Sequence, residues 1–404
     1  MLWIHVLANL LMITLDVAWW IIIVRLAKRT LWRILLGAFM AFQIVAITSQ
    51  LLGYVGSRFD ITHRLPPAAG ALFIIWHYLV LPAITTLGCL YIGVRLIRRA
   101  RLSRASKNAS AAPVTVPATA GVQSRREFIG TCAALAPSVF TFSLAGVALA
   151  QLNHFRLRRF TLAIPTLPRA LDGLTIAHLT DIHVGEWTHG PVLQEMVNTT
   201  NALGADLVLV TGDLINYELR DLPEAISLLK ETQSRYGMWM VEGNHDLYQN
   251  GLEFERRVKA AGIKLLLDES DVGIVRGYPV QFFGLRWMEC FGATRDEITS
   301  LQVRELMKQR RPDAFPIFLA HHPHAFDAAV AAQMPLTLTG HTHGGQLMLD
   351  NQVGVGPALF RYWSGLYKKD NSQLIVSNGV GNMFPIRINA PAEIVHITLR
   401  CGSA

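Results

Sequence analysis

The sequence contains few charged residues and few cysteines for its length. Asp, Glu, Lys and Arg together make up 16% of its 404 residues, whereas an ordinary soluble domain has about 25%. The hydrophobic fraction of 51% excludes an intrinsically disordered chain, because disordered segments have low hydrophobicity. Four cysteines are too few for a disulfide-stabilised scaffold. A chain of this length can form two or three domains.

Acidic residues are scarce in the first 150 residues, which hold 3 Asp and Glu against 14 Lys and Arg. The rest of the chain holds 26 acidic and 23 basic residues, so the net charge of +8 divides into +11 and −3. A basic protein is first suspected of binding nucleic acid or an anionic membrane. Because the basic excess lies outside the C-terminal half, we expect no nucleic-acid partner.

The N-terminal part contains four apolar runs, each long enough to cross a bilayer as a helix of about 20 residues. Three runs lie within residues 1–100, and the fourth lies within residues 124–150. Lys and Arg cluster after the first and third runs, and short basic loops stay in the cytoplasm. We therefore expect a multi-pass protein of the inner or cell membrane, with its C-terminal domain on the extracytoplasmic face. The runs are Leu2–Val24, Ile34–Val55, Gly70–Val94 and Phe128–Ala150.

One ionisable residue, Asp16, lies in the middle of the first apolar run. Charged side chains inside membrane spans are costly and face the interior of a helix bundle. We expect Asp16 to face a neighbouring helix or a cavity.

The segment before the fourth run has the composition of a linker. Residues 101–123 are rich in Ala, Ser, Thr and Pro, which predicts a flexible connection. The residues from Ser124 to Ile129, with Arg125 and Arg126, resemble a twin-arginine export signal. The run ends in Ala148-Leu149-Ala150, the small-x-small form of a signal-peptidase site. Residues 124–150 are therefore either a twin-arginine-like signal or a fourth transmembrane helix with arginine anchors.

From residue 174 the pattern changes to short apolar strands, polar turns and amphipathic helices, so residues 151–404 are predicted to form an α/β domain. Asp, Asn or His follows five of the apolar strands, at the sheet edge where open α/β domains bind ligands. Imidazoles and carboxylates together bind first-row divalent metals. These motifs contain no cysteine, so we do not expect a zinc site with thiolate ligands. The motifs are Asp181-Ile182-His183, Gly212-Asp213, Gly243-Asn244-His245-Asp246, His321-His322-Pro323 and Gly340-His341-Thr342-His343.

These five blocks, in this order, resemble the signature of the calcineurin-like metallophosphoesterases, and the resemblance covers about residues 172–400. Gly344-Gly345-Gln346 and Pro385-Ile386-Arg387 are similar to its membrane-associated bacterial branch. The resemblance implies a four-layer αββα sandwich with two divalent metal ions, of Mn, Fe or Zn, at its edge. It assigns Asp213 as the bridging ligand between the two ions. The other implied ligands are Asp181, His183 and His343 for the first ion and Asn244, His321 and His341 for the second.

The resemblance also implies a reaction in which a hydroxide bridging the two ions attacks the phosphorus in line. It places His245 beside the substrate, to stabilise the phosphate or to donate a proton to the leaving oxygen. Asp246 is expected either to orient His245 or to cap the following helix. Arg387 is expected either to clamp a phosphate through two hydrogen bonds or to form a surface ion pair.

Three classes of function remain open from the sequence. The favoured one is a membrane-associated phosphoesterase, expected to be a phosphodiesterase, that hydrolyses a phosphate ester of the cell envelope. The second is a pyrophosphatase similar to the UDP-diacylglucosamine hydrolases of lipid A synthesis, and the predicted topology counts against it. The third is a membrane sensor with a vestigial metal site, and the intact ligand set counts against that. Aromatic and basic residues over 354–369 fit either a membrane interface, and hence a lipid-linked substrate, or packing at the sandwich edge.

Overall fold

A computed structural model describes residues 2–54, 62, 65–105, 125–152, 154–288, 293–350 and 352–402. The chain divides into two compact units, Met1–Val147 and Ala148–Ala404.

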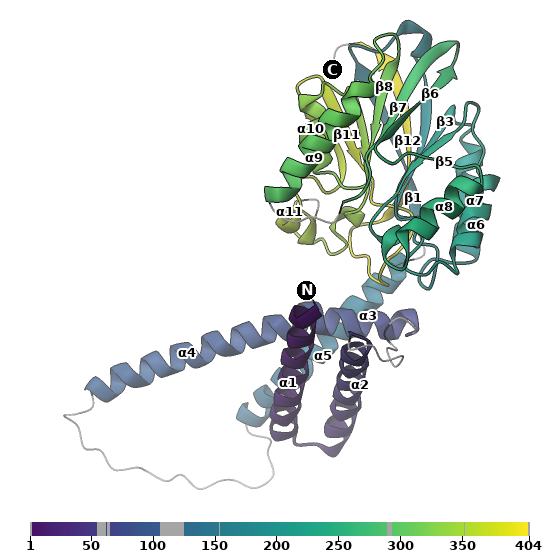
Figure 1. Cartoon of the computed structure of the whole chain (residues 1–404). Helices are drawn as coiled ribbons and strands as arrows, with labels where there is room; N and C mark the ends of the chain where they lie inside the picture. Colours follow the sequence, from purple (N-terminus) through teal and green to yellow (C-terminus); the bar gives the residue numbers. More distant parts are fainter. Residues whose placement is uncertain are drawn as a thin grey trace, which may run out of the picture. The chain divides into compact units, whose positions relative to one another are not determined.

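The first unit is built from long apolar helices (Figure 1). Four helical stretches are long and apolar enough to cross a membrane, and each overlaps one of the four predicted runs: Trp3–Leu26, Thr30–Gly53, Pro67–Arg99 and Glu127–Leu152. The third stretch contains a π-helical turn between two α-helical parts. The helices are α1 (Leu2–Leu26), α2 (Thr30–Tyr54), α3 (Pro67–Ile75), the π-helical turn η2 (Trp76–Val80), α4 (Leu81–Ala105) and α5 (Arg125–Leu152).

The predicted linker is shorter than expected at its N-terminal end. Helix α4 continues to Ala105, so residues 101–105 are helical rather than part of a linker. Arg101 and Arg104 are good helix formers, and they extend the helix beyond its apolar part. The rest of the predicted linker and Ser124 of the twin-arginine-like motif lie outside the described residues.

Asp16 lies where the sequence predicts, against a neighbouring helix of the same unit. It is fully buried, and its Oδ1 accepts a hydrogen bond of 2.7 Å from Nε1 of Trp76. Its Oδ2 lies 2.9 Å from Nε2 of His77. Both partners belong to the π-helical turn η2. A π-helical turn shifts the helical register. In η2 the successive side chains of Trp76 and His77 both contact the Asp16 carboxylate.

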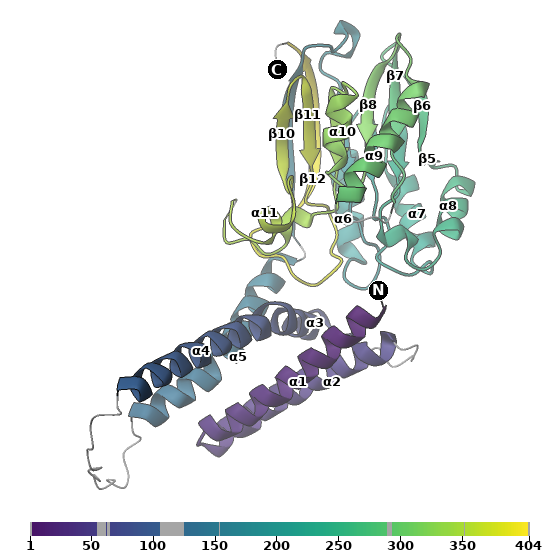
Figure 2. The ribbon, with the colours of Figure 1, turned by 60° about the vertical axis from the view of Figure 1, so that its left-hand side comes forward.

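The second unit contains two six-stranded mixed sheets (Figures 1 and 2). The first sheet has the order β1 (Phe155–Ile164), β12 (Ala392–Cys401), β2 (Thr175–Leu179), β3 (Leu207–Thr211), β4 (Met238–Val241) and β5 (Lys264–Leu265). The second has the order β10 (Gly365–Lys369), β11 (Ser372–Val376), β9 (Leu336–Thr339), β8 (Phe315–Leu319), β7 (Tyr278–Gly284) and β6 (Glu269–Val275).

Alternate residues of the strands pack on opposite faces, and this alternation builds four layers. Leu207 and Leu209 of β3 face the second sheet, in a core shared with Ile317 of β8. Trp239 of β4 stacks on Phe282 of β7 with ring centroids 3.8 Å apart. The two sheets therefore pack face to face.

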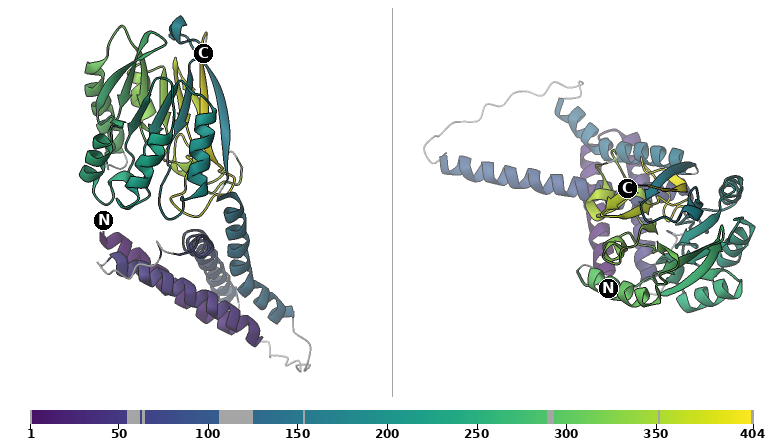
Figure 3. Two further views of the ribbon diagram at one scale, coloured as in Figure 1. Left: turned by 90° about the vertical axis from the view of Figure 1, so that its right-hand side faces the viewer. Right: turned by 90° about the horizontal axis from the view of Figure 1, so that it is seen from above.

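Helices cover the outer face of each sheet, as the predicted αββα sandwich requires. Val208 and Val210 of β3 pack into the core beneath three helices, which Figure 3 shows in teal on the outside of the first sheet. Phe318 of β8 packs beneath two helices on the other side (Figure 2). The helices are α6 (Pro191–Ala202), α7 (Leu222–Glu231), α8 (Gly251–Ala260), α9 (Ala293–Leu306) and α10 (Ala325–Ala331).

Candidate metal centre

The five motifs follow the carboxyl ends of five strands: β2, β3 and β4 of the first sheet, and β8 and β9 of the second. Within each sheet these strands are parallel, so their carboxyl ends lie at one edge. The two sheets face each other, and the motif loops meet at this common edge. The structure therefore brings together residues that lie as far as 162 positions apart, from Asp181 to His343.

The backbone at this edge is strained. A positive φ is uncommon for a non-glycine residue, and each costs about 1–3 kcal/mol unless the surrounding structure requires it. Such strain is concentrated at functional sites. Five of the seven predicted ligands have φ angles between 48° and 72°: Asp181, His183, Asp213, His341 and His343.

The first group of ligand atoms comes from the ends of β2 and β9. Nε2 of His183 lies 3.0 Å from Nε2 of His343, and Nε2 of His343 lies 3.3 Å from Oδ1 of Asp181. Oδ2 of Asp213 lies 3.5 Å from Nε2 of His183. Nitrogen lone pairs and carboxylate oxygens at such distances repel one another unless a proton or a cation lies between them.

The second group shares Asp213 with the first. Oδ2 of Asp213 lies 3.1 Å from Nε2 of His321, and this Nε2 lies 3.2 Å from Nδ1 of His341. Nδ1 of His321 donates a hydrogen bond of 2.6 Å to the carbonyl of Thr211. That bond fixes the ring orientation, so Nε2 is the nitrogen that faces Asp213.

Asn244 has the features of a further ligand. Its Nδ2 donates a hydrogen bond of 2.6 Å to the hydroxyl of Tyr248. Its Oδ1 is buried and has no hydrogen-bond partner in the described part of the chain. Buried polar atoms are normally satisfied, so this oxygen fits the ligand position that the sequence assigns to it.

The electrostatics of the two groups also fit a cation. Burial, together with neighbouring imidazoles, holds the pKa values of His183, His341 and His343 well below the ordinary value. Neutral imidazoles are the form that binds metals. Burial alone would lower the pKa of His321 as well, but the Asp213 carboxylate outweighs it and raises this pKa to about 9. A proton on His321 thus supplies the positive charge that Asp213 requires, and a divalent cation supplies it instead when bound.

Two glycines allow the carboxylates to approach the neighbouring loops. A Cβ atom at Gly243 would collide with the carboxylate of Asp213, and one at Gly340 would collide with the carboxylate of Asp181. The residues present therefore fit a divalent metal site made of carboxylate oxygens and imidazole nitrogens.

His245 lies beside the shared ligand Asp213. Its backbone N–H donates to Oδ1 of Asp213 at 2.8 Å, and its ring lies edge-on to His183 with centroids 4.6 Å apart. Nδ1 donates a hydrogen bond of 2.6 Å to the carbonyl of Asn216. Nε2 is therefore the nitrogen left to exchange a proton with a bound molecule. Asn216 is a functional residue that the sequence does not reveal, because it acts through its main chain.

Asp246 takes neither of its two expected roles. Its Oδ1 accepts hydrogen bonds from the backbone N–H groups of Leu214 and Ile215, at 2.8 and 3.1 Å. Its Oδ2 accepts one from Gly243 at 2.9 Å. The carboxylate contacts neither the ring of His245 nor a helix terminus as a cap. It instead joins the loop after β3 to the loop after β4, so it fixes the distance between Asp213 and Asn244.

Arg387 is placed differently from both expectations. Its side chain is 1% exposed, which rules out a surface ion pair. The guanidinium donates hydrogen bonds to Oδ1 of Asn382 at 2.6 Å and to the carbonyls of Ala390 and Gly381 at 3.0 and 2.6 Å. One of its nitrogens also lies 3.2 Å from Nδ1 of His343. All three nitrogens thus contact the protein, so the geometry favours a positioning residue over a phosphate clamp.

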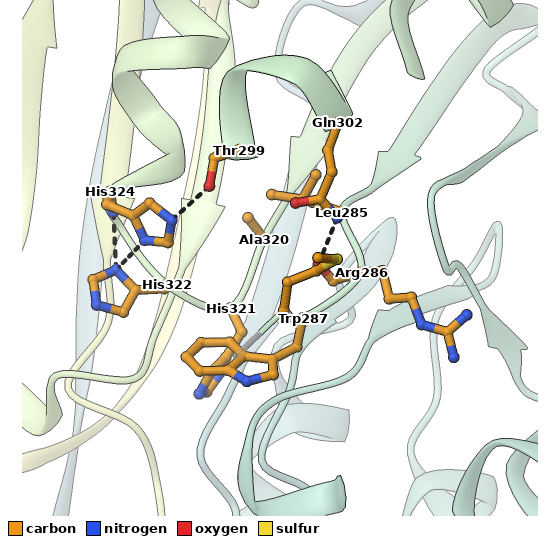
Figure 4. Close-up of a pocket in the computed structure, with 10 residues that line it drawn as sticks. Leu285, Arg286, Trp287, Thr299, Gln302, Ala320, His321, His322 and His324 are labelled. Atoms are coloured by element: carbon orange, nitrogen blue, oxygen red, sulfur yellow. Dashed lines mark hydrogen bonds between the residues drawn. The ribbon is translucent and has the colours of Figure 1, made fainter. Parts of the chain in front are cut away.

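Aromatic side chains and further histidines border the second ligand group (Figure 4). Trp287 lies beside His321 and His341, with ring centroids 5.5 and 5.2 Å apart. Nδ1 of His322 accepts a hydrogen bond of 3.1 Å from the backbone N–H of His324. Nε2 of His322 lies 3.0 Å from the guanidinium of Arg295. His322 is thereby held outside the two ligand groups.

Comparisons with known proteins agree with the motifs. Residues 174–345 match the sequence profile of the calcineurin-like phosphoesterase family. An uncharacterized metallophosphoesterase of Campylobacter jejuni is 29% identical over 243 residues, covering 58% of this chain and 61% of that protein. A transmembrane protein with metallophosphoesterase domain of Danio rerio is 29% identical over 250 residues, covering 59% of this chain and 55% of that protein. An uncharacterized metallophosphoesterase of Bacillus subtilis is 26% identical over 294 residues, covering 69% of this chain and 98% of that protein.

The chain thus spans less than two thirds of the length of the first two relatives. The relatives come from both bacteria and animals, so the similarity is not confined to the bacterial branch that the sequence suggests. The shared motifs, their strand-end positions and the four-layer sandwich agree with one another. The C-terminal part of this chain contains a calcineurin-like phosphoesterase domain.

Proposed function

We propose that the protein is a membrane-associated phosphoesterase that uses two divalent metal ions to hydrolyse a phosphate ester of the cell envelope, with phosphodiesters as its preferred substrates. One observation carries the proposal: two groups of ligand atoms share the Asp213 carboxylate. A single carboxylate between two ligand sets is the arrangement by which two-metal sites hold ions about 3.5–4 Å apart.

The residues of the chain take distinct roles in this proposal. Divalent ions of Mn, Fe or Zn suit the oxygen and nitrogen ligand set, and when bound they activate water and polarise the phosphate. Asp213 holds the two ligand groups in register, and Asp246 fixes the loops that carry Asp213 and Asn244. His245, oriented by the carbonyl of Asn216, stabilises the phosphate or donates a proton from Nε2 to the leaving oxygen.

The membrane part of the proposal rests on the four apolar helices and on the transmembrane relative. The basic clusters after the first and third runs support an extracytoplasmic catalytic domain. A topology reporter fused after Ala404 tests on which side of the membrane the catalytic domain lies. A cytoplasmic reporter signal would contradict the proposed topology and would favour the pyrophosphatase alternative.

Metal content and hydrolysis of the purified full-length protein test the chemistry. We expect Asp213→Ala and His341→Ala to lose bound metal and to reduce hydrolysis of a chromogenic phosphodiester by at least about a thousandfold. His189→Ala is the matched control, because His189 is exposed and belongs to none of the ligand groups. Undiminished hydrolysis by the Asp213 variant would refute the assignment.

Hydrolysis assays of the same purified protein distinguish the substrate classes. The protein is assayed with each candidate metal on a phosphomonoester, a phosphodiester and a pyrophosphate diester. Fastest cleavage of the phosphodiester supports the proposal, and fastest cleavage of the pyrophosphate supports the alternative pyrophosphatase. If the protein binds its full complement of metal and cleaves none of these esters, the result would favour the alternative of a non-enzymatic membrane sensor.

A further inference from the structure

A set of exposed apolar side chains borders the metal centre, and we name it the apolar rim. Leu349 and Leu359 are 80% and 70% exposed, which is high for leucine in a folded domain. Contiguous exposed apolar surface marks a site of interaction with a protein, a ligand or a membrane. The rim consists of Leu349, Val353, Val355 and Leu359.

Hydrogen bonds and a short helix connect the rim residues. Leu349 N–H donates a hydrogen bond of 2.8 Å to the carbonyl of Val353. Oδ1 of Asp350 accepts hydrogen bonds from the backbone N–H groups of Gln352 and Val353, at 2.7 and 2.8 Å. Helix α11 (Val355–Leu359) follows. Leu349 and Val353 are thus joined to each other next to the helix that carries Val355 and Leu359.

The rim adjoins the metal centre. Helix α11 packs against η7 (His343–Gly345), which begins at the ligand His343. Phe360, the residue after Leu359, lies with its ring centroid 6.0 Å from His341 and 5.9 Å from His322. One residue therefore separates an exposed leucine from a side chain that contacts the ligand group.

The rim is also joined to the end of the apolar helix α5. The carbonyl of Leu152, the last residue of that helix, accepts a hydrogen bond of 3.1 Å from Nδ2 of Asn382. Oε1 of Gln151 accepts one of 2.9 Å from the backbone N–H of Asn389. Nδ2 of Asn389 donates in turn to the carbonyls of Met348 and Leu349, at 2.9 and 3.2 Å. The end of a membrane-length helix and the tip of the rim are therefore two hydrogen bonds apart.

Two cations of the neighbouring basic segment form ion pairs within the protein. Arg361 forms an ion pair with Asp327, and Nζ of Lys369 lies 2.9 Å from the same carboxylate. Tyr362 packs on Phe326 with ring centroids 5.4 Å apart. These three residues therefore make contacts at the sandwich edge.

We propose that the apolar rim inserts into the membrane surface where α5 ends, and that the substrate is a lipid-linked phosphate ester that reaches the metal centre past α11. The proposal rests on the proposed phosphoesterase function and specifies its substrate class. Because the rim is apolar, its membrane contact does not depend on anionic lipids.

Photocrosslinking tests the contact without using the activity. A benzophenone amino acid is placed at position 359 of the full-length protein in lipid nanodiscs, and at position 274 as the matched control. Ile274 is 64% exposed and pairs with Pro279 near the start of β7, which runs parallel to β8, so it lies at the edge of the sheet opposite the metal centre. We expect lipid adducts at position 359 and not at 274. Absence of adducts at 359, or equal yields at both positions, would overturn the proposal.

Kinetics in the same nanodiscs test the substrate class. The double variant Leu349→Asn/Leu359→Asn is compared with the control Leu252→Asn/Ile274→Asn, whose residues are 76% and 64% exposed. We expect the rim variant to hydrolyse a bilayer-embedded long-chain phosphodiester at least about tenfold more slowly, and a water-soluble phosphodiester at an unchanged rate. An unchanged rate on the embedded ester, or equal losses on both esters, would overturn the substrate assignment.

A different result would show that the proposed phosphoesterase function is wrong. Lipid adducts at position 359 in a wild-type protein that hydrolyses neither ester would contradict the phosphoesterase proposal and support the membrane contact.

Discussion

Replacing Arg387 by methionine removes a buried guanidinium and keeps much of the side-chain volume. The change leaves four acceptors without their donor: Oδ1 of Asn382 and the carbonyls of Asn378, Gly381 and Ala390. A buried acceptor left unsatisfied costs about 1–3 kcal/mol. At the lower end of this range, four acceptors predict that the free energy of unfolding falls by about 4 kcal/mol.

Thermal unfolding of the full-length protein at constant metal concentration measures this loss. For a domain of about 150–250 residues, 1 kcal/mol shifts the unfolding temperature by about 2–4 °C, so we expect a fall of about 8–16 °C. His343 also loses a neighbour that holds its ring, so metal affinity should fall by about 10–100-fold. Arg387→Lys keeps the charge but not the planar array of donors, so it should restore only part of the stability.

If Arg387 instead clamps a phosphate of the substrate, the opposite pattern is expected. A phosphate clamp would raise KM for a soluble ester and leave the unfolding temperature unchanged, and that result would refute our reasoning. Arg400→Met is the control, because Arg400 is 53% exposed and pairs with Asp172 at the surface. Its effect on the free energy of unfolding should stay within about 0.5 kcal/mol.

Three further predictions follow from buried groups. Burial lowers the pKa of His178 to about 3. Below pH 6.5 this histidine is therefore protonated in the unfolded chain but not in the folded one. The free energy of unfolding then falls by about 1.4 kcal/mol per pH unit, down to about pH 3. A His178→Gln variant should show a shallower fall in urea titrations, and an equal slope would contradict the assignment. Asp246→Asn leaves at least one of three backbone donors unsatisfied, so urea titrations should show a loss of about 1–3 kcal/mol, and a wild-type midpoint would count against this role. Gly340→Ala brings a Cβ onto the carboxylate of Asp181, so elemental analysis should find less metal, and a full complement would refute the close approach.

The fold and the ligand positions could be predicted from the sequence because they depend on local patterns. Each apolar strand is short and ends in a polar motif, and the structure confirms the strand before each of the five motifs. The apolar pattern does not predict β1 or β10. Arg156, Arg158 and Arg159 interrupt it in β1, and Lys368 and Lys369 interrupt it in β10. Arg156 and Arg158 are compensated by Glu393 of the neighbouring strand β12, which is 237 residues away from Arg156 in the chain.

The roles of the supporting residues could not be predicted, because they depend on which groups each side chain contacts in the folded loops. Asn216 orients His245 through a carbonyl, and every residue type has one. Asp246 and Arg387 lie in motifs that suggest chemistry, yet the Asp246 carboxylate binds backbone N–H groups of the loop after β3, and the Arg387 guanidinium binds groups of its own loop. Only the three-dimensional arrangement shows which polar side chains still face the centre.

The contact between Asp16 and His77 has a consequence for how the first unit inserts into a membrane in the proposed topology. Nδ1 of His77 lies 3.0 Å from the carbonyl of Phe73, and Nε2 of His77 lies 2.9 Å from Oδ2 of Asp16. During synthesis α1 precedes η2 by about fifty residues. In the proposed topology it therefore enters the bilayer before its carboxyl group meets its partners, at a cost of about 2.5–3.5 kcal/mol. The first span thus depends on a later one to complete its insertion, and a chain truncated before residue 76 should be poorly retained in the membrane.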